Sequence, residues 1–163
     1  MLLRDALESD LPAITNIYNY EIANNTATFD ENEKTLQERK IWFEEHQKRP
    51  YLLLVAELQG KISGYASLSA YGSKDAFSCT AELSVYVDKE VRGHGIGEQL
   101  VREVISRAKT NGGLHLIISL ITSSNKASIA LHKKTGFKFC GRIDEIARKF
   151  GQFQGVDFYT LTL

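Results

Sequence analysis

The alternation of apolar and polar residues predicts strands and helices in a definite order. The range Thr80–Val87 has the two-residue period of a strand, which places Glu82 and Tyr86 together on one face. Apolar residues then recur at helical spacing over residues 100–108, and residues 114–121 form a dense apolar run typical of a buried strand. The middle of the chain is therefore expected to fold as strand, helix and strand.

Turn and capping residues place the remaining elements. We expect a strand at residues 2–6, a helix after Ser9-Asp10 with Pro12 in its first turn, and a second helix opened by the capping box of residues 35–38. The other expected elements are a hairpin of strands 51–58 and 62–69, a short helix over 125–131, and strands 137–142 and 156–163. Because no repeat, linker or low-complexity segment interrupts this order, we expect one domain over residues 1–163, with an α+β (mixed α/β) fold around one sheet.

Composition and charge narrow the class of partner. The 163 residues include 20 basic and 20 acidic side chains, so no overall field attracts nucleic acid or an anionic membrane. Cys79 and Cys140 form neither a CxxC pair nor a cluster with histidine, which indicates a reducing compartment and no metal site, and both are expected to be buried. The N-terminus shows no signal peptide and no apolar run is long enough to span a bilayer, so we expect a cytoplasmic protein.

The strand Thr80–Val87 and the following helix are joined by a glycine-rich segment, Arg92-Gly93-His94-Gly95-Ile96-Gly97. With little side-chain bulk in the way, its N–H groups can converge on an anion at the positive end of that helix, which predicts a phosphate site. A Walker loop would need a Gly-Lys-Ser/Thr ending, and the dinucleotide fingerprint would need glycine at position 98 or 100. Glu98 and Leu100 stand there, which excludes the fingerprint, and the missing lysine excludes the Walker loop.

The R-x-x-G-x-G pattern of residues 92–97 is similar to the R/Q-x-x-G-x-G/A signature of the GNAT acetyltransferases. Together with the strand Thr80–Val87 and the pattern N-x-x-S-x-x-L-H-x-x-x-G-F of residues 125–137, it resembles the phosphinothricin and methionine sulfoximine N-acetyltransferase branch of that family. The resemblance implies a mostly antiparallel mixed sheet, flanked by helices and splayed between its fourth and fifth strands, where acetyl-CoA enters. It also implies direct acetyl transfer to the amine of a small amino-acid-like acceptor by a homodimer.

Amine acetylation needs a base, because an amine is mostly protonated at neutral pH and must lose a proton before it attacks the thioester. Glu82 is the candidate, since it is the only carboxylate between Asp75 and Asp88, and the resemblance implies that it acts directly or through water. The resemblance places His132 where a general acid would protonate the leaving thiolate, and Tyr86 is the competing candidate. A surface ion pair for Glu82, and simple packing for His132 and Tyr86, are the alternative interpretations.

The same resemblance indicates which residues hold acetyl-CoA. Main-chain groups of the strand are expected to pair with the pantetheine amides, and a main-chain N–H near Val87 to stabilise the oxyanion. The loop is expected to hold the pyrophosphate, and Asn125 to reach the pantetheine arm while it caps its helix. The expected cofactor-binding residues are Val85, Tyr86, Val87, Arg92, Gly93, His94, Gly95, Ile96, Gly97, Glu98 and Asn125.

The acceptor site departs from the pattern of the branch. An Arg-x-Ala-Tyr pattern typically precedes the catalytic strand there, whereas this chain has Lys-Asp-Ala-Phe at residues 74–77. Lys74 can still neutralise a carboxylate or phosphinate but lacks the bidentate fork of arginine, and Phe77 lacks the hydroxyl. Phe29 is expected to form an apolar wall, or only to anchor its loop. Two other functions stay open: a non-catalytic acyl-CoA-binding sensor, and an enzyme that acetylates protein N-termini or lysines.

Overall fold

The computed structural model describes all residues of the chain, 1–163, and joins seven strands into one sheet in the order β1-β2-β3-β4-β5-β7-β6. Every neighbouring pair is antiparallel except β4 and β5, which run parallel. The strands are β1 (Leu2–Asp5), β2 (Leu52–Leu58), β3 (Lys61–Ala70), β4 (Thr80–Val87), β5 (Leu116–Thr122), β6 (Lys138–Lys149) and β7 (Gln152–Thr162). The expected mixed, mostly antiparallel sheet is confirmed.

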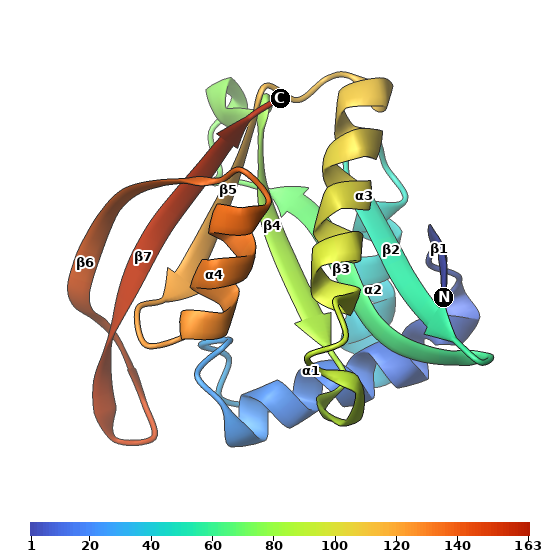
Figure 1. Cartoon of the computed structure of the whole chain (residues 1–163), viewed down its shortest axis with the longest axis horizontal. Coiled ribbons are helices and arrows are strands. Elements are labelled where there is room, and N and C mark those ends of the chain that lie inside the picture. The colour runs from blue at the N-terminus through green and yellow to red at the C-terminus, as the bar shows by residue number, and fades with distance from the viewer.

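Two pairs of helices cover the two faces of this sheet (Figure 1). One face carries α1 (Leu11–Asn24) and α2 (Leu36–His46), and the other carries α3 (Ile96–Asn111) and α4 (Lys126–Lys134). Short 3-10 turns lie between these elements: η1 (Glu8–Asp10), η2 (Asp75–Phe77) and η3 (Lys89–Val91). Each helix pair encloses its own apolar core with the sheet.

The two cores separate the two faces of β4. On the α3 face, Leu100 of the helix and Leu83 of the strand are buried in one cluster. On the other face, Ile14 of α1 packs with Tyr65 of β3, and Tyr86 borders this second cluster. Each fully buried aliphatic side chain contributes roughly 1.5–3 kcal/mol to folding. The faces of β4 are therefore those that the alternation of its residues predicts.

β4 and β5 pair over residues 80–82 and 116–118 and then diverge. Beyond that point β4 stays paired with β3 as far as Val87, while β5 stays paired with β7 as far as Thr122. Each strand thus keeps one partner and leaves its other edge without a ladder. The opening expected between the fourth and fifth strands is present.

β6 and β7 form a hairpin that is longer than the sequence pattern predicts. The pattern predicts strands at 137–142 and 156–163, whereas the ladder continues to the pair Lys149 and Gln152, with positive φ at Phe150 and Gly151 in the turn. The hairpin projects beyond the rest of the sheet (Figure 1), and most of β6 is exposed on both faces. A strand without a buried face has no apolar alternation, so this pattern cannot reveal it.

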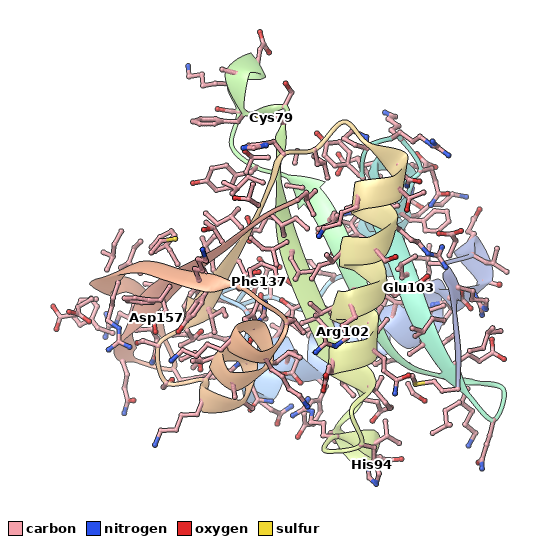
Figure 2. All side chains as sticks on the ribbon, turned by 45° about the horizontal axis from the view of Figure 1, so that its top comes forward. Cys79, His94, Arg102, Glu103, Phe137 and Asp157 are labelled. Carbon is pink, nitrogen blue, oxygen red and sulfur yellow. The ribbon has the colours of Figure 1, made fainter.

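Local signals are confirmed in some places and wrong in others. Glu38 N donates to Thr35 Oγ1 (3.2 Å) and Thr35 N donates to the Glu38 carboxylate (2.8 Å), which is the expected capping box of α2. Cys79 and Cys140 are exposed rather than buried, because Cys79 lies in the turn before β4 (Figure 2) and Cys140 lies on the edge strand β6. None of the helices combines the length and apolar character that a membrane crossing requires.

Candidate active site

A cleft of about 450 Å³ opens where β4 and β5 diverge, and the start of α3 and the length of α4 complete its lining. All the residues expected to bind the cofactor line it except His94, which lies at the exposed tip of the loop (Figure 2). His132 also lines it, whereas Glu82 lies directly beside the first lining residue of β4, Leu83. The fold therefore gathers the expected cofactor residues around one cleft.

The loop before α3 presents free N–H groups to this cleft. Gly93 and Gly95 have φ angles of 81° and 77°, which other residues adopt only with strain, and Gly95 is the N-cap of the helix. The first helical hydrogen bond runs from Gln99 N to Gly95 O (3.1 Å), so the N–H groups of residues 96–98 have no acceptor within the helix. These groups and the positive end of the helix dipole can hold phosphate oxygens.

Arg92 braces this loop from within the protein. Its guanidinium pairs with the carboxylate of Glu21 in α1, and its Nε donates to Val87 O (3.1 Å). The Glu21 side chain is only 5% exposed, and a carboxylate so placed is stable only when it is paired. The pair therefore ties the end of β4 and the start of the glycine-rich loop to α1.

Glu98 places a negative charge in the first turn of α3, at the expected phosphate site. Lys134 Nζ (2.6 Å) and Arg102 (3.0 Å) both pair with this carboxylate, and they hold the pKa of Glu98 below its usual value. Glu98 and Lys134 line the cleft. Two cations against one carboxylate leave this edge of the cleft positive, which favours an anionic ligand.

Glu82 lies on the face of the sheet that α1 and α2 cover, where β4 and β5 make their last pair. Its neighbour across the ladder with β3 is Ser69, whose hydroxyl is 2.8 Å from His46 Nε2. Burial raises the pKa of the Glu82 carboxyl, and no charged or hydrogen-bonding neighbour counteracts this effect. A carboxylate in such surroundings is a better proton acceptor than an exposed one, as the removal of a proton from an amine requires.

His132 lies in the second half of α4 and is buried. Its Nδ1 is 2.8 Å from the main-chain oxygen of Ser128, and because a carbonyl only accepts, the proton is assigned to Nδ1 and the lone pair to Nε2. Burial lowers the pKa of the imidazole, so it is neutral at neutral pH. Asn125 caps the same helix by accepting a hydrogen bond from Ser128 N (3.1 Å).

Tyr86 stands on the opposite side of the cleft from His132. Its ring packs edge-on against Tyr18 (5.2 Å between centroids) and at a tilt against Tyr65 (5.4 Å). Burial raises the pKa of the Tyr86 hydroxyl well above its usual value, so the phenol keeps its proton. The two acid candidates thus approach the cleft from different faces of the sheet.

The expected acceptor residues lie outside the lining of this cleft. The loop of Phe29 reaches the cleft only through Ala27, and Phe29 itself is 36% exposed. Lys74 and Phe77 belong to the exposed segment around η2, where Phe77 packs edge-on against Tyr71 (5.6 Å). This segment directly precedes β4, so it lies at the same end of that strand as Glu82, the candidate base.

The polar lining residues that the sequence motifs do not single out include Glu21 and Ser119. Glu21 lies one turn after Ile17 on the buried face of α1, and a carboxylate on an apolar face was an available signal. Ser119 interrupts the apolar run of β5, which was a second signal. Lys134 also lines the cleft; the sequence predicts that it and the other two lysines of α4, Lys126 and Lys133, are solvated, or that one of them contacts the adenosine phosphate.

Comparison with known proteins gives the same assignment. The model of the acetyltransferase (GNAT) family matches residues 15–137. The chain belongs to the GNAT acetyltransferase family. A methionine sulfoximine/methionine sulfone acetyltransferase of Pseudomonas aeruginosa is 39% identical over 99% of this chain and 94% of its own length. A phosphinothricin N-acetyltransferase of Streptomyces coelicolor is 36% identical over 96% of this chain and 93% of its own.

Solved structures of other acetyltransferases share the fold of this GNAT chain. One from Salmonella typhimurium, solved with its cofactor acetyl-CoA, has a TM-score of 0.97 and 35% identity, over 100% of this chain and 94% of its own. A ribosomal-protein-alanine N-acetyltransferase from Brucella melitensis has a TM-score of 0.96 and 38% identity over 100% of both chains. The expected GNAT fold is confirmed.

Acetyl-CoA, the acetyl donor of GNAT enzymes, matches the groups around the cleft. The free N–H groups of residues 96–98 suit its pyrophosphate, and the open edge of β4 at Val85 and Val87 suits its amides. Two buried polar atoms in the lining, Ser119 Oγ and His132 Nε2, have no hydrogen-bond partner in the protein, so a ligand can supply one. When bound, this cosubstrate supplies an activated acetyl group.

Proposed function

We propose that this GNAT enzyme transfers the acetyl group of acetyl-CoA to the amine of a small amino-acid-like acceptor of the methionine sulfoximine or phosphinothricin type. One observation carries the proposal: the carboxylate of Glu82, whose pKa is raised by burial, lies beside the lining residue Leu83, at the end of the cleft where β4 and β5 make their last pair. The names of the Pseudomonas and Streptomyces relatives describe acceptors of this type, which supports the acceptor class.

In this proposal Glu82 removes the proton from the acceptor amine, directly or through one water molecule. Its raised pKa brings it closer to that of the amine, which lowers the cost of the proton transfer. The neutral amine then attacks the thioester without a covalent enzyme intermediate. A main-chain N–H near Val87 stabilises the negative charge that develops on the carbonyl oxygen.

His132 and Tyr86 are the proposed candidates for the acid that protonates the leaving sulfur. Tyr86 keeps its proton because burial raises its pKa. Neutral His132 carries no proton on Nε2 and would first have to gain one, which burial opposes. The protonation states therefore favour Tyr86 in the resting enzyme.

We assign recognition of the acceptor to Phe29, Lys74 and Phe77. Phe29 would contact the apolar part of the acceptor, and the ammonium of Lys74 would neutralise its carboxylate or phosphinate. Support comes from the position of η2 directly before β4, at the same end of the strand as Glu82. Phe77 offers no hydroxyl, so it would recognise shape rather than a polar group.

The experiment that tests the proposal measures thiol release from acetyl-CoA with a panel of amino acids, methionine sulfoximine, phosphinothricin, polyamines and peptides. Glu82→Gln should lower kcat about 100- to 10,000-fold with the best amine while CoA still binds. Glu45→Gln, an exposed carboxylate on α2, is the matched control and should keep full activity. A Glu82→Gln enzyme that keeps full activity would remove the base from the mechanism.

A second function is acetylation of a protein N-terminus, as the name of the Brucella structure describes for that protein. Competition separates a small-amine acceptor from a protein acceptor. A peptide should displace small amino acids from the site only if the peptide occupies the same groove. Tight CoA binding without acetylation of any amine or peptide would instead favour a sensor.

We further propose a cytoplasmic homodimer in which residues 1–163 form one domain. Exposed apolar side chains gather on the hairpin, with Phe139, Ile143 and Phe153 between 49% and 65% exposed, and β6 is an edge strand. Two free, exposed cysteines fit a reducing compartment. Light scattering should give twice the mass of the chain, and Phe153→Ser should shift it toward the monomer.

A further inference from the structure

Ser119 is a polar break in a buried apolar stripe of β5. Side chains alternate along a strand, so Ser119 shares a face with Ile117 and Ile121, which belong to the core under α3 and α4. Its direct neighbour across the ladder with β7 is Tyr159, whose ring is 6.5 Å from the ring of His132. The Ser119 side chain therefore lies on the α4 side of the sheet and is only 1% exposed.

The hydroxyl of Ser119 makes no hydrogen bond within the protein, although it is buried. Such a group normally finds a partner, because leaving it unpaired costs its full desolvation. Ser119 lines the cleft between β4 and β5, and so does the other unpaired atom of this region, His132 Nε2. The unpaired hydroxyl of Ser119 thus lies in the cleft where the acetyl donor is expected to bind.

The two unpaired atoms have different chemical roles. His132 donates its Nδ1 proton to Ser128 O, so Nε2 offers only a lone pair. The Ser119 hydroxyl always carries a proton that it can donate. Of these two unpaired atoms, Ser119 Oγ is therefore the one that can donate a hydrogen bond in the resting enzyme.

The sheet separates Ser119 from Glu82. Glu82 lies on the α1 and α2 face, so the amine that it deprotonates approaches the thioester from that side. Ser119 lies on the opposite face, beside α4. The sulfur lies in the plane of the carbonyl that the amine attacks, so the attacking amine leaves the side of the sulfur that faces Ser119 free.

We propose that Ser119 donates a hydrogen bond to the sulfur of CoA as the carbon–sulfur bond breaks and sulfur takes up the electron pair. This inference rests on the proposed function. Ser119 forms no covalent bond and keeps its proton, and the thiolate gains its own proton from an acid or from water as it leaves. His132, which accepts rather than donates, supports the cleft wall as a positioning residue.

Kinetics of three variants test this role. Ser119→Ala should lower kcat about 10-fold or more, less than the roughly 100- to 1,000-fold of an oxyanion donor because a thiolate leaves more easily, with the KM for acetyl-CoA within about twofold. Ser119→Thr keeps the hydroxyl and should restore most of the rate. Ser67→Ala, an equally buried serine of β3 outside the cleft, should keep the wild-type kcat.

Thermal unfolding separates this role from a structural one. Because the hydroxyl has no partner in the protein, Ser119→Ala should unfold at the same or a higher temperature than the wild type. A slow variant with an undiminished Tm supports the proposal. Loss of Tm in parallel with kcat would make Ser119 a structural residue and overturn it.

A titration of the CoA complex reads the sulfur directly and needs no acceptor amine. The ultraviolet absorption of the thiolate should appear at lower pH in the wild-type complex than in Ser119→Ala, by about one pH unit for a tenfold effect. Equal midpoints, together with an unchanged kcat, would overturn the inference alone. If the wild-type enzyme acetylates no amine but the midpoints differ, the proposed function fails while the contact between Ser119 and sulfur stands.

Discussion

The Lys149 ammonium donates a hydrogen bond of 2.7 Å to the main-chain oxygen of Thr28. Lys149 lies at the tip of the β6–β7 hairpin and is 2% exposed, and Thr28 directly precedes Phe29 in the loop between α1 and α2. Two segments far apart in sequence therefore meet beside Phe29, the proposed apolar contact of the acceptor. This contact is one of those that hold the loop of Phe29, together with the hydrogen bond between Tyr18 and Thr28.

Replacement of Lys149 by methionine should weaken acceptor binding without changing acetyl-CoA binding. Loss of the hydrogen bond frees the loop at a cost of about 1 kcal/mol, which corresponds to roughly a fivefold higher KM for the acceptor. Steady-state kinetics with each substrate varied in turn measure this. Arg148→Met, at the exposed neighbouring position, is the control and should change neither KM. An increase confined to the KM for acetyl-CoA would contradict this assignment.

The pair of Arg92 and Glu21 should show strong coupling in a double-mutant cycle. Arg92→Ala leaves a buried carboxylate without a partner, and because the arginine side chain is 44% exposed we expect a loss of only about 1–2 kcal/mol in the free energy of unfolding. Glu21→Gln in the same chain should recover part of it. Urea unfolding of the four proteins gives the coupling, and additive losses would show that the contact contributes nothing.

Gly95→Ala should cost both stability and affinity for CoA. A side chain at a φ of 77° is strained by roughly 1–2 kcal/mol, and relief of that strain should move the N–H groups that are proposed to hold the phosphate. Gly60, in the β2–β3 turn, has the same φ, and a methyl group added at either glycine would meet no atom within 4 Å. Gly60→Ala should therefore lose similar stability but bind CoA normally, as calorimetry can establish. Equal loss of affinity in both variants would argue against a local phosphate site.

Stability should fall as the pH drops below about 6.5. Burial lowers the pKa of His132 and of His46 in the folded state, so on acidification the unfolded chain takes up protons first. This proton uptake lowers the free energy of the unfolded chain relative to that of the folded chain. The stabilisation is fully present above the unfolded pKa of about 6.5 and is lost as the pH falls toward the folded values. Urea unfolding at pH 7.5 and 5.5 measures the difference, which His132→Gln should reduce and the exposed His115→Gln should not.

The rate should show an acid limb that belongs to Glu82. Because burial raises the pKa of this carboxyl, kcat/KM should fall as the pH drops through a value above 4.5, the ordinary value for glutamate. Glu82→Gln should remove the limb along with most of the rate. A fall of kcat/KM at or below pH 4.5 in the wild type would indicate a solvent-exposed base rather than the half-buried Glu82.

Local and periodic features of the fold could be predicted from the sequence. The bounds of β4 are predicted correctly because one of its faces packs in a core. The turn before α3 is predicted from its glycines, two of which have positive φ. The hairpin tip escapes prediction because it has no buried face to impose a pattern. The spacing of apolar residues therefore predicts which faces are buried, and it predicts a strand or helix only where that element has a buried face.

Contacts between distant segments could not be predicted in this way. Arg92 and Glu21 are 71 positions apart, and Lys149 and Thr28 are 121 apart, so no local spacing links them. The candidate site shows the same limit. Its glycine-rich loop and strand follow from motifs, but the side of the sheet on which Ser119 lies follows only from the pairing of β5 with β7.

Because β4 and β5 diverge, the rigidity of this enzyme should depend on its own cosubstrate. Strand edges that lack a ladder should exchange their amide hydrogens quickly, and a ligand that pairs with Val85 and Val87 should slow that exchange. A ligand present at a hundredfold excess over its Kd adds about 2.7 kcal/mol to the stability of the folded state. The amount of folded enzyme that survives proteolysis in a cell should therefore follow the supply of acetyl-CoA.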